Sequence, residues 1–326
     1  MHYALIILGA LAVIAVYVTW RRRQRARTAV PEWARFFSQT QYRAFGSAVE
    51  LALVERDLAA TLQGGVVVAL LPDGRPVQLG LQNLAQQCAR ADAQHWQSLI
   101  GAHVDAVLGA VAEAEAVDLS DFSQVRPLLR VRLFPTDALE PSDPPTVVAR
   151  PVAEGLAAVL AYDLPSTVAS VSPEALAPWG RTEDELFDLA LDNVRKEQPP
   201  DKEHAEVERG VVLRSLAGDS FFVASHLLLI DRQLPGELPY GALVSVPTRH
   251  LVLYHAIRDA RVLVAINALI PQTHRLYQQG PGSLSPNLYW YHKGDYLLLP
   301  TRMSDGTVKF TPPQAFVEAV MTPLAE

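Results

Sequence analysis

The sequence predicts an α+β protein with a mixed β-sheet and packed helices, preceded by one transmembrane helix. Three features predict this class: an uncharged N-terminal run, short extended segments that end at Pro, Gly or Asp turns, and intervening segments with a helical apolar rhythm. The length of 326 residues suits one large domain or two smaller ones. Hydrophobic residues make up 49% of the chain, which excludes a disordered protein.

Residues 1–27 predict a membrane anchor. Tyr3 to Trp20 form an 18-residue run without a charged side chain, and as a helix it spans ~27 Å, close to the ~30 Å hydrocarbon core of a bilayer. A basic cluster follows it: Arg21, Arg22, Arg23, Arg25 and Arg27. A cleaved signal peptide and a buried soluble helix are the alternatives, but a signal peptide carries its positive charge before the apolar run.

The order of apolar run and basic cluster predicts a single-pass protein of the cell membrane. Positive charge resists translocation, so we expect the N-terminus outside and the C-terminal domain in the cytoplasm. The lipid bilayer is then a partner, through the N-terminal helix and the cluster Arg21–Arg27. The cluster could also act only as a stop signal for translocation.

Charge and cysteine content exclude several classes of function. Without the five arginines of the anchor, the chain holds 23 basic and 35 acidic residues, a net charge of −12. An acidic body disfavours nucleic-acid binding. Cys88 is the single cysteine, so no intramolecular disulfide or multi-cysteine zinc site can form. We expect neither a metal site nor a cofactor, because the histidines are scattered and no phosphate-binding glycine loop is present.

The rest of the chain divides into a connector and a large domain. Residues 28–64 predict a connector and an amphipathic helix, the helix running over Phe45–Leu62. Residues 65–326 predict one cytoplasmic α+β domain, with a break between two lobes in the loop near 135–147.

Up to three β-β-α units recur in the large domain. Each has two extended segments around a turn and then a helix, with strand pairs at 66–71 and 76–81, at 157–162 and 167–171, and at 242–246 and 251–255. A true duplication and the common order of any α+β protein both explain this recurrence.

Smaller elements are predicted from local patterns. Thr182 opens a helix with a capping box. Residues 129–133 alternate apolar and basic side chains, which indicates a strand with Arg130 and Arg132 on a wet face. Hairpins are expected over 211–224 and 288–299, and a loop over 198–202.

Three stretches of the large domain resemble the uncharacterised bacterial YtpQ-like family, over roughly residues 75–300. They are LAYDLPSTVASVSPEALAPWGRTEDELFDLALDNVRK (160–196), SHLLLIDRQL (225–234) and GALVSVPTRHLVLY (241–254). Matching positions include Asp163 at a strand end, Ala190 with Asn193 late in a helix, and Val246-Pro247. His250 stands where members often carry Asp. The resemblance implies a shared fold unit and supplies no catalytic residues.

Two polar residues are the candidate ligand-binding groups. Asp163 ends a predicted strand and Arg249 follows the Val-Pro pair, and binding sites of α/β folds often gather where strands end. A turn-forming aspartate and a surface arginine are the simpler explanation of the same residues.

Two functions remain open from the sequence. The first is a membrane-anchored cytoplasmic binding or interaction domain, for which we expect a protein partner rather than a small-molecule ligand. The second is a membrane-tethered hydrolase that uses Asp163, one of the histidines and Ser220, since Gly218-Asp219-Ser220 and Asp201-Lys202-Glu203-His204 match motifs of one esterase family. In that family the two motifs occur in the opposite order. Convergence of Asp163, Arg249 and a histidine in one pocket would favour the enzyme.

Overall fold

The computed structural model describes residues 30–325 except 64, 140–144, 166, 235, 237 and 305–306. The chain forms two compact units, unit 1 (Met1–Asp105) and unit 2 (Ala106–Glu326), and the boundary falls inside helix α4 (Trp96–Ala116). This boundary lies upstream of the break expected near 135–147. A helix rather than a loop therefore carries the chain from one unit into the other.

The predicted transmembrane helix requires a correction. Residues 1–27, which hold the uncharged run and the arginine cluster, lie outside the described residues. Among the residues that are described, none of the helices combines the length and the apolar character that crossing a bilayer demands. The single-pass topology and the cell-membrane localisation, with the N-terminus outside and the C-terminal domain cytoplasmic, are therefore not supported.

Unit 1 is a three-stranded antiparallel sheet with helices. Its elements are η1 (Glu32–Ala34), α2 (Gln39–Val54), β1 (Ala59–Gln63), β2 (Val66–Leu70), β3 (Pro76–Gly80), α3 (Gln82–Arg90), η2 (Ala93–His95) and the first turns of α4. Ser38 caps α2 through a capping box with Gln41. The helix predicted over Phe45–Leu62 starts earlier and ends at Val54, because the chain turns at Asp57 (φ 55°) and pairs β1 with β2.

The first sheet of unit 2 has four strands, all antiparallel to their neighbours. It contains β4 (Leu129–Pro135), β5 (Ala149–Ala153), β6 (Leu156–Leu164) and β7 (Thr167–Ser170), in the order β4-β6-β5 with β7 also on β6. Helix α6 (Glu183–Lys196) packs on β4. The expected mixed sheet is wrong, since every strand pair in the described part of the chain is antiparallel.

The second sheet of unit 2 has six strands in the order β13-β12-β10-β11-β9-β8. They are β8 (Asp201–Val207), β9 (Val211–Ala217), β10 (Ala242–Thr248), β11 (Leu251–Ala256), β12 (Leu288–His292) and β13 (Asp295–Leu299). The β12–β13 hairpin is as predicted. The hairpin predicted over 211–224 is wrong: β9 pairs with β8 and β11 instead, and residues 223–232 form the helical segment η6 (Val223–Arg232). Residues 201–202, expected in a loop, begin β8.

The remaining elements of unit 2 are short apart from one long helix. They are α5 (Phe122–Val125), η3 (Thr136–Ala138), η4 (Pro173–Trp179), η5 (Glu208–Gly210), α7 (Val262–Gln279), β14 (Thr301–Ser304), β15 (Thr307–Phe310), α8 (Gln314–Phe316), the π-helical turn η7 (Val317–Met321) and α9 (Thr322–Ala325). Strands β14 and β15 pair as a separate ribbon.

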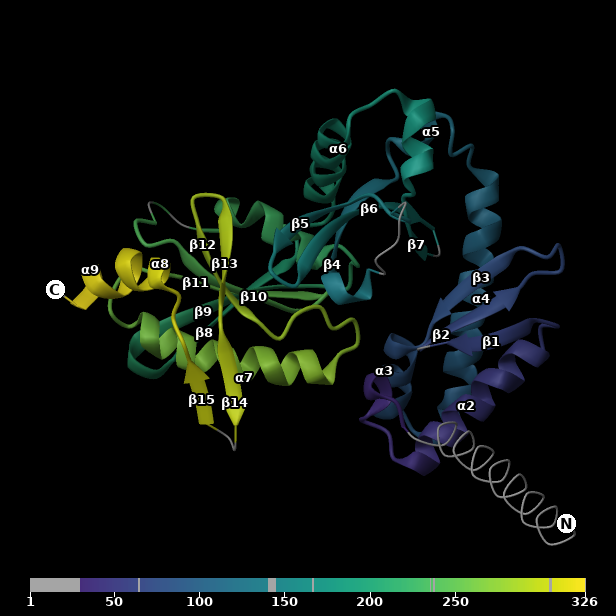
Figure 1. Cartoon of the computed structure of the whole chain (residues 1–326), viewed down its shortest axis with the longest axis horizontal. Helices are drawn as coiled ribbons and strands as arrows, with labels where there is room; N and C mark the ends of the chain where they lie inside the picture. The colour runs from purple at the N-terminus through teal and green to yellow at the C-terminus, as the bar shows by residue number, and fades with distance from the viewer. Residues whose placement is uncertain are drawn as a thin grey trace, which may run out of the picture. The chain divides into compact units, whose positions relative to one another are not determined.

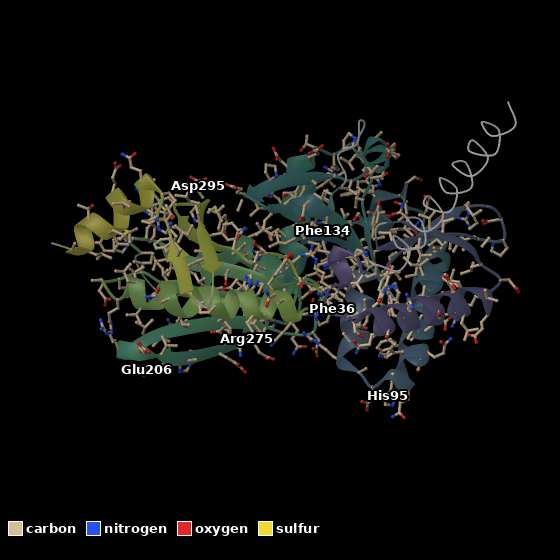
Figure 2. All side chains as sticks on the ribbon, turned by 60° about the horizontal axis from the view of Figure 1, so that its bottom comes forward. Phe36, His95, Phe134, Glu206, Arg275 and Asp295 are labelled. Carbon is tan, nitrogen blue, oxygen red and sulfur yellow. The ribbon has the colours of Figure 1, made fainter. Side chains whose placement is uncertain are left out.

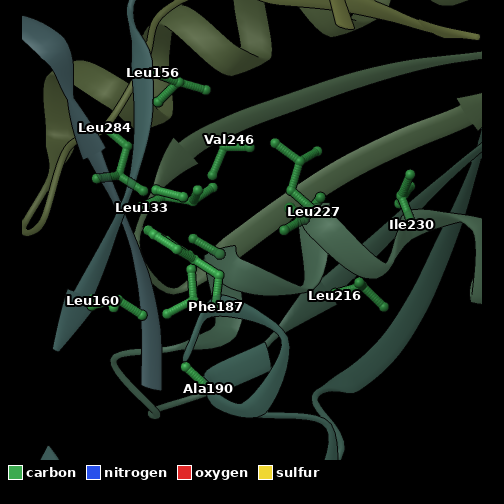
Figure 3. Close-up of a cluster of buried hydrophobic side chains, with 14 of the residues drawn as sticks. Leu133, Leu156, Leu160, Phe187, Ala190, Leu216, Leu227, Ile230, Val246 and Leu284 are labelled. Carbon is green, nitrogen blue, oxygen red and sulfur yellow. The ribbon is translucent and has the colours of Figure 1, made fainter. Parts of the chain in front are cut away.

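The six-stranded sheet buries both faces, because alternate residues of each strand enter different cores. Val244 and Val246 belong to a core shared with β4, β6, α6 and η6, part of which Figure 3 shows around Leu133, Phe187 and Leu227. Leu243 belongs to the opposite core with α7, which lies along that face of the sheet (Figure 1). The sheet thus holds unit 2 together.

All three predicted hairpin-then-helix units are present. Strands β2 and β3 precede α3, β6 and β7 precede α6, and β10 and β11 precede α7. Each hairpin lies in a different sheet with different neighbours. Their tertiary settings therefore differ although the local order repeats, and whether they arose by duplication stays a prediction.

Candidate functional site

Strand β4 carries two arginines on one face. Leu129, Val131 and Leu133 are buried in the core, and the alternation of a strand puts Arg130 and Arg132 on the opposite side. Helix α6 fixes this strand: the Asn193 Nδ2 amide donates hydrogen bonds to the backbone oxygens of Arg126 (2.9 Å) and Leu129 (3.0 Å). The two arginines are therefore presented from a rigid element, about 6.6 Å apart along the strand.

Arg130 is the centre of an ionic network. Its Nε donates to Glu197 Oε1 at 2.5 Å, and its Nη2 lies 3.5 Å from Asp163 Oδ2. Ser220 Oγ donates to the other oxygen of Glu197 at 3.1 Å. Burial raises the pKa of Asp163, an effect that Arg130 opposes and Glu197 reinforces. Asp163, the first candidate residue, is thus held by an arginine of the same sheet.

Arg249, the second candidate, lies in the two-residue turn between β10 and β11. Its N–H donates to the backbone oxygen of Gly282 (2.8 Å), and its own backbone oxygen accepts from Ala224 N–H (3.0 Å). The backbone oxygen of His250 accepts from Gly218 N–H at 3.3 Å. These bonds tie the turn to η6, to the end of β9 and to the loop after α7, so the turn is rigid.

Gly282 leaves room for the Arg249 side chain. A Cβ atom at Gly282 would lie 2.8 Å from Arg249 Cγ and 2.9 Å from its Cδ, closer than packed atoms approach each other. Gly282 also has φ +77°, a conformation that other residues rarely adopt. The stem of Arg249 therefore runs directly over the backbone of this glycine.

His250 is held as a neutral ring. Its Nδ1 lies 3.1 Å from the backbone oxygen of Gly218, and a carbonyl can only accept, so Nδ1 carries the proton. Nε2 then accepts from Arg249 Nε at 2.9 Å. Burial lowers the pKa of His250 and the Arg249 charge lowers it further. The histidine thus orients the Arg249 guanidinium without neutralising it.

Arg132 and Arg249, termed here the arginine pair, are half-buried and lie near each other. Burial lowers the pKa of Arg249 to about 10, and burial with the nearby Arg249 charge lowers that of Arg132 to about 10. Arg132 Nε is buried without a hydrogen-bond partner among the described residues. Each guanidinium lies over an aromatic ring, Arg132 over Phe134 at 4.5 Å and Arg249 over Phe221 at 4.3 Å.

Neither member of the arginine pair is paired with a carboxylate of the residues that the structure describes. No ion pair joins Arg132 or Arg249 to an acidic side chain of the described part of the chain, in contrast to Arg130. Each guanidinium stacks with its flat face over an aromatic ring, so N–H groups at its edge remain available to other hydrogen-bond partners. The pair is therefore a half-buried charge of +2 that no carboxylate of the described residues neutralises, the arrangement that an anion stabilises.

The structure does not bring Asp163 and Arg249 into contact. Asp163 binds Arg130, whereas Arg249 neighbours Arg132, two residues further along the same face of β4. The two candidates therefore flank one strand face, with the carboxylates at one end and the arginine pair at the other.

The predicted hydrolase set does not form a nucleophile–base pair. Ser220 Oγ donates to Glu197 and accepts from Phe222 N–H at 3.1 Å. Both ring nitrogens of His250 are engaged by Gly218 and Arg249, and His204 is exposed on the edge strand β8. A Ser–His–Asp mechanism needs the serine hydroxyl bonded to the histidine, and this arrangement lacks that bond. Nor do the described residues gather three metal-ligating side chains.

The sequence pattern missed Arg132 as a site residue. The alternation in LRVRLFP places it correctly on one face of a strand, but that pattern predicts a wet face. Its surroundings come from distant segments, since β4 contacts η6 and the Arg249 charge lies nearby, and both follow β4 by roughly 90 residues or more in the sequence. The signal in the sequence that could have identified Arg132 was the pair of arginines on the outer face of one strand.

Comparison of the chain with protein-family models, with curated proteins and with solved structures gave no match. The resemblance to the YtpQ-like family therefore stays a prediction, and the site rests on its own geometry.

Proposed function

We propose that unit 2 is a binding domain whose ligand presents an anionic oxygen group, a carboxylate or a phosphate, to the arginine pair. The observation that carries this proposal is that Arg132 and Arg249 lie half-buried and near each other, with no acidic partner among the described residues. The proposed binding function does not depend on a membrane anchor.

The energetics favour an anionic ligand over a neutral one. Burial lowers the pKa of both arginines, and the nearby Arg249 charge lowers that of Arg132 further, so two like charges repel each other at a desolvated site. An anion between them removes the repulsion and supplies charge-assisted hydrogen bonds, each worth about 1.5–3 kcal/mol. Nucleic acid is a poor source of the phosphate because the chain is acidic.

The rigidity of the site supports a binding role. The arginines stand on β4 and on a hairpin turn fixed by three backbone hydrogen bonds, so little order remains to be gained when a ligand binds. A carboxylate from a protein partner and a free organic anion share the chemistry that this site recognises. The protein partner expected from the sequence stays a prediction.

Isothermal titration calorimetry on the full chain tests the proposal with two probes, inorganic phosphate and acetate, at constant ionic strength. We expect saturable binding of at least one probe and a loss of about 10-fold to 100-fold in affinity for Arg249→Gln, the equivalent of one charge-assisted interaction. The better probe identifies the class of anion.

The matched control is Arg275→Gln. This substitution removes the same charge from the exposed side of α7 (Figure 2), and Arg275 takes no part in the arginine pair. Equal losses in both variants would indicate a general charge effect and contradict the proposal, as would the absence of binding by either probe to the unmodified chain.

A further inference from the structure

Unit 1 contains a small cavity between α2 and the first two strands of its sheet. Its volume is about 110 Å³, comparable with the ~150 Å³ engineered cavity that admits benzene in another protein. The α2 residues that line it lie three or four positions apart and form one face of the helix: Tyr42, Phe45, Gly46, Val49, Glu50 and Leu53.

Gly46 provides the room for this cavity. It lies in the interior of α2, where glycine destabilises a helix by about 0.5–1 kcal/mol relative to alanine. No atom lies within 4 Å of the position that a Cβ atom would occupy there, so packing does not require a glycine. A larger side chain at this position would project into the cavity.

Two aromatic rings form a corner of the cavity. Trp33 and Tyr42 have centroids 5.9 Å apart and planes at 72°. The Trp33 ring is seated on the backbone of Gly65, because a Cβ atom there would lie 3.1 Å from three atoms of the indole. Tryptophan and tyrosine rings that line a small space are the groups with which aromatic cages bind alkylated ammonium ions.

Glu50 is the charged residue of the lining. It is exposed, and it makes no hydrogen bond or ion pair with another described residue. A carboxylate beside aromatic walls complements a cation whose surface is apolar, and it does not favour an anion or a neutral hydrocarbon.

We infer that this cavity binds a small organic cation, an ammonium group that carries methyl groups. The inference rests on the aromatic corner, on the unpaired Glu50 and on the space left by Gly46. It concerns unit 1 alone and is independent of the anion site of unit 2.

Calorimetric titration of the full chain with tetramethylammonium chloride tests the inference, with sodium chloride to match ionic strength. The neutral control is tert-butyl alcohol, which resembles tetramethylammonium in shape because its methyl groups surround one carbon, but which carries no charge. We expect a millimolar or tighter Kd for the cation and binding at least about tenfold weaker for the alcohol. Choline and N-trimethyl-lysine methyl ester, as further probes, distinguish a free ligand from a modified side chain.

Variants locate the binding. Gly46→Leu fills the cavity and should abolish binding while the melting temperature stays level or rises, because leucine favours the helix. Glu50→Gln should weaken binding by about threefold to tenfold, and Glu55→Gln, the same change outside the lining, should leave the Kd unchanged.

Three results would overturn the inference. They are equal affinity for the alcohol and the cation, retained binding by Gly46→Leu with an unchanged fold by circular dichroism, and a Kd for tetramethylammonium weaker than about 10 mM. If Gly46→Leu loses binding and also has a lowered melting temperature, Glu50→Gln becomes the deciding variant. An unchanged Kd for Glu50→Gln then contradicts the inference.

Discussion

At the scale of single residues, the environment of each side chain decides its role. Arg130 and Arg132 share one strand face, yet Arg130 is neutralised by Glu197 and Asp163, whereas no acidic side chain of the described ranges pairs with Arg132. Ser220 and His250 carry groups that could support catalysis, but each is occupied by another contact. What each side chain can do at this site therefore depends on its hydrogen-bond and ionic partners, which the residue type alone does not determine.

A residue-scale prediction concerns the close approach at Gly282. Gly282→Ala should lower the free energy of unfolding by about 2–3 kcal/mol, since a positive φ and a displaced Arg249 stem add together. The displaced arginine should also weaken the binding of the anionic probe. Chemical denaturation and calorimetry measure the two effects.

The control for that prediction is Gly294→Ala. Gly294 has φ +96° in the β12–β13 turn, and a Cβ atom there meets no atom within 4 Å. It should cost only the backbone strain, about 1 kcal/mol, and leave anion affinity unchanged. Equal effects of the two variants on both measurements would show that Arg249 does not depend on the glycine.

At the scale of elements, local hydrogen-bonding signals were reliable. The capping box at Thr182 forms as predicted, with Thr182 N–H donating to Glu185 Oε2 (3.0 Å) and Glu185 N–H donating to Thr182 Oγ1 (3.3 Å). The prediction failed where strand pairing decides, as at 221–224, which the pattern assigned to a hairpin and the fold placed in a turn and the first residues of η6. Apolar runs of this length suit either a strand or a helix, and tertiary contacts choose between them.

The element-scale prediction is that Thr182→Ala destabilises unit 2 by about 1 kcal/mol, because the N–H of Glu185 at the start of α6 loses its hydroxyl acceptor. Thr182→Ser keeps the hydroxyl and should retain most of the stability. Denaturation followed by circular dichroism compares the three proteins. Equal destabilisation by Ser and Ala would mean that the methyl group of Thr182, rather than the cap, matters.

At the scale of the whole molecule, buried and half-buried histidines make stability depend on pH. Burial lowers the pKa of His103 in unit 1 and of His226, His250 and His255 in unit 2. The unfolded chain, with histidine pKa values near ~6.5, then binds more protons than the folded one just below that pH. Stability is therefore fully present above the unfolded value and decreases as the pH falls below it.

We expect the free energy of unfolding to fall from pH 7.5 to pH 5.5 by up to ~1.4 kcal/mol per pH unit for each such histidine. Unit 2, with three of them, should lose more than unit 1, with one. Urea denaturation across this range measures the slope. A flat profile, or greater loss in unit 1, would contradict the assignment of neutral buried rings.

The sequence by itself determined the α+β class, the three hairpin-then-helix units and the helix cap at Thr182. These follow from apolar periodicity, turn residues and hydrogen bonds between near neighbours, all of which are local. Tertiary structure decided that the described sheets are antiparallel, that β9 pairs with β8 and β11, and that Arg132 meets Arg249 across about 117 positions. Desolvation and charge pairing depend on which distant segments pack together, and no local pattern encodes that.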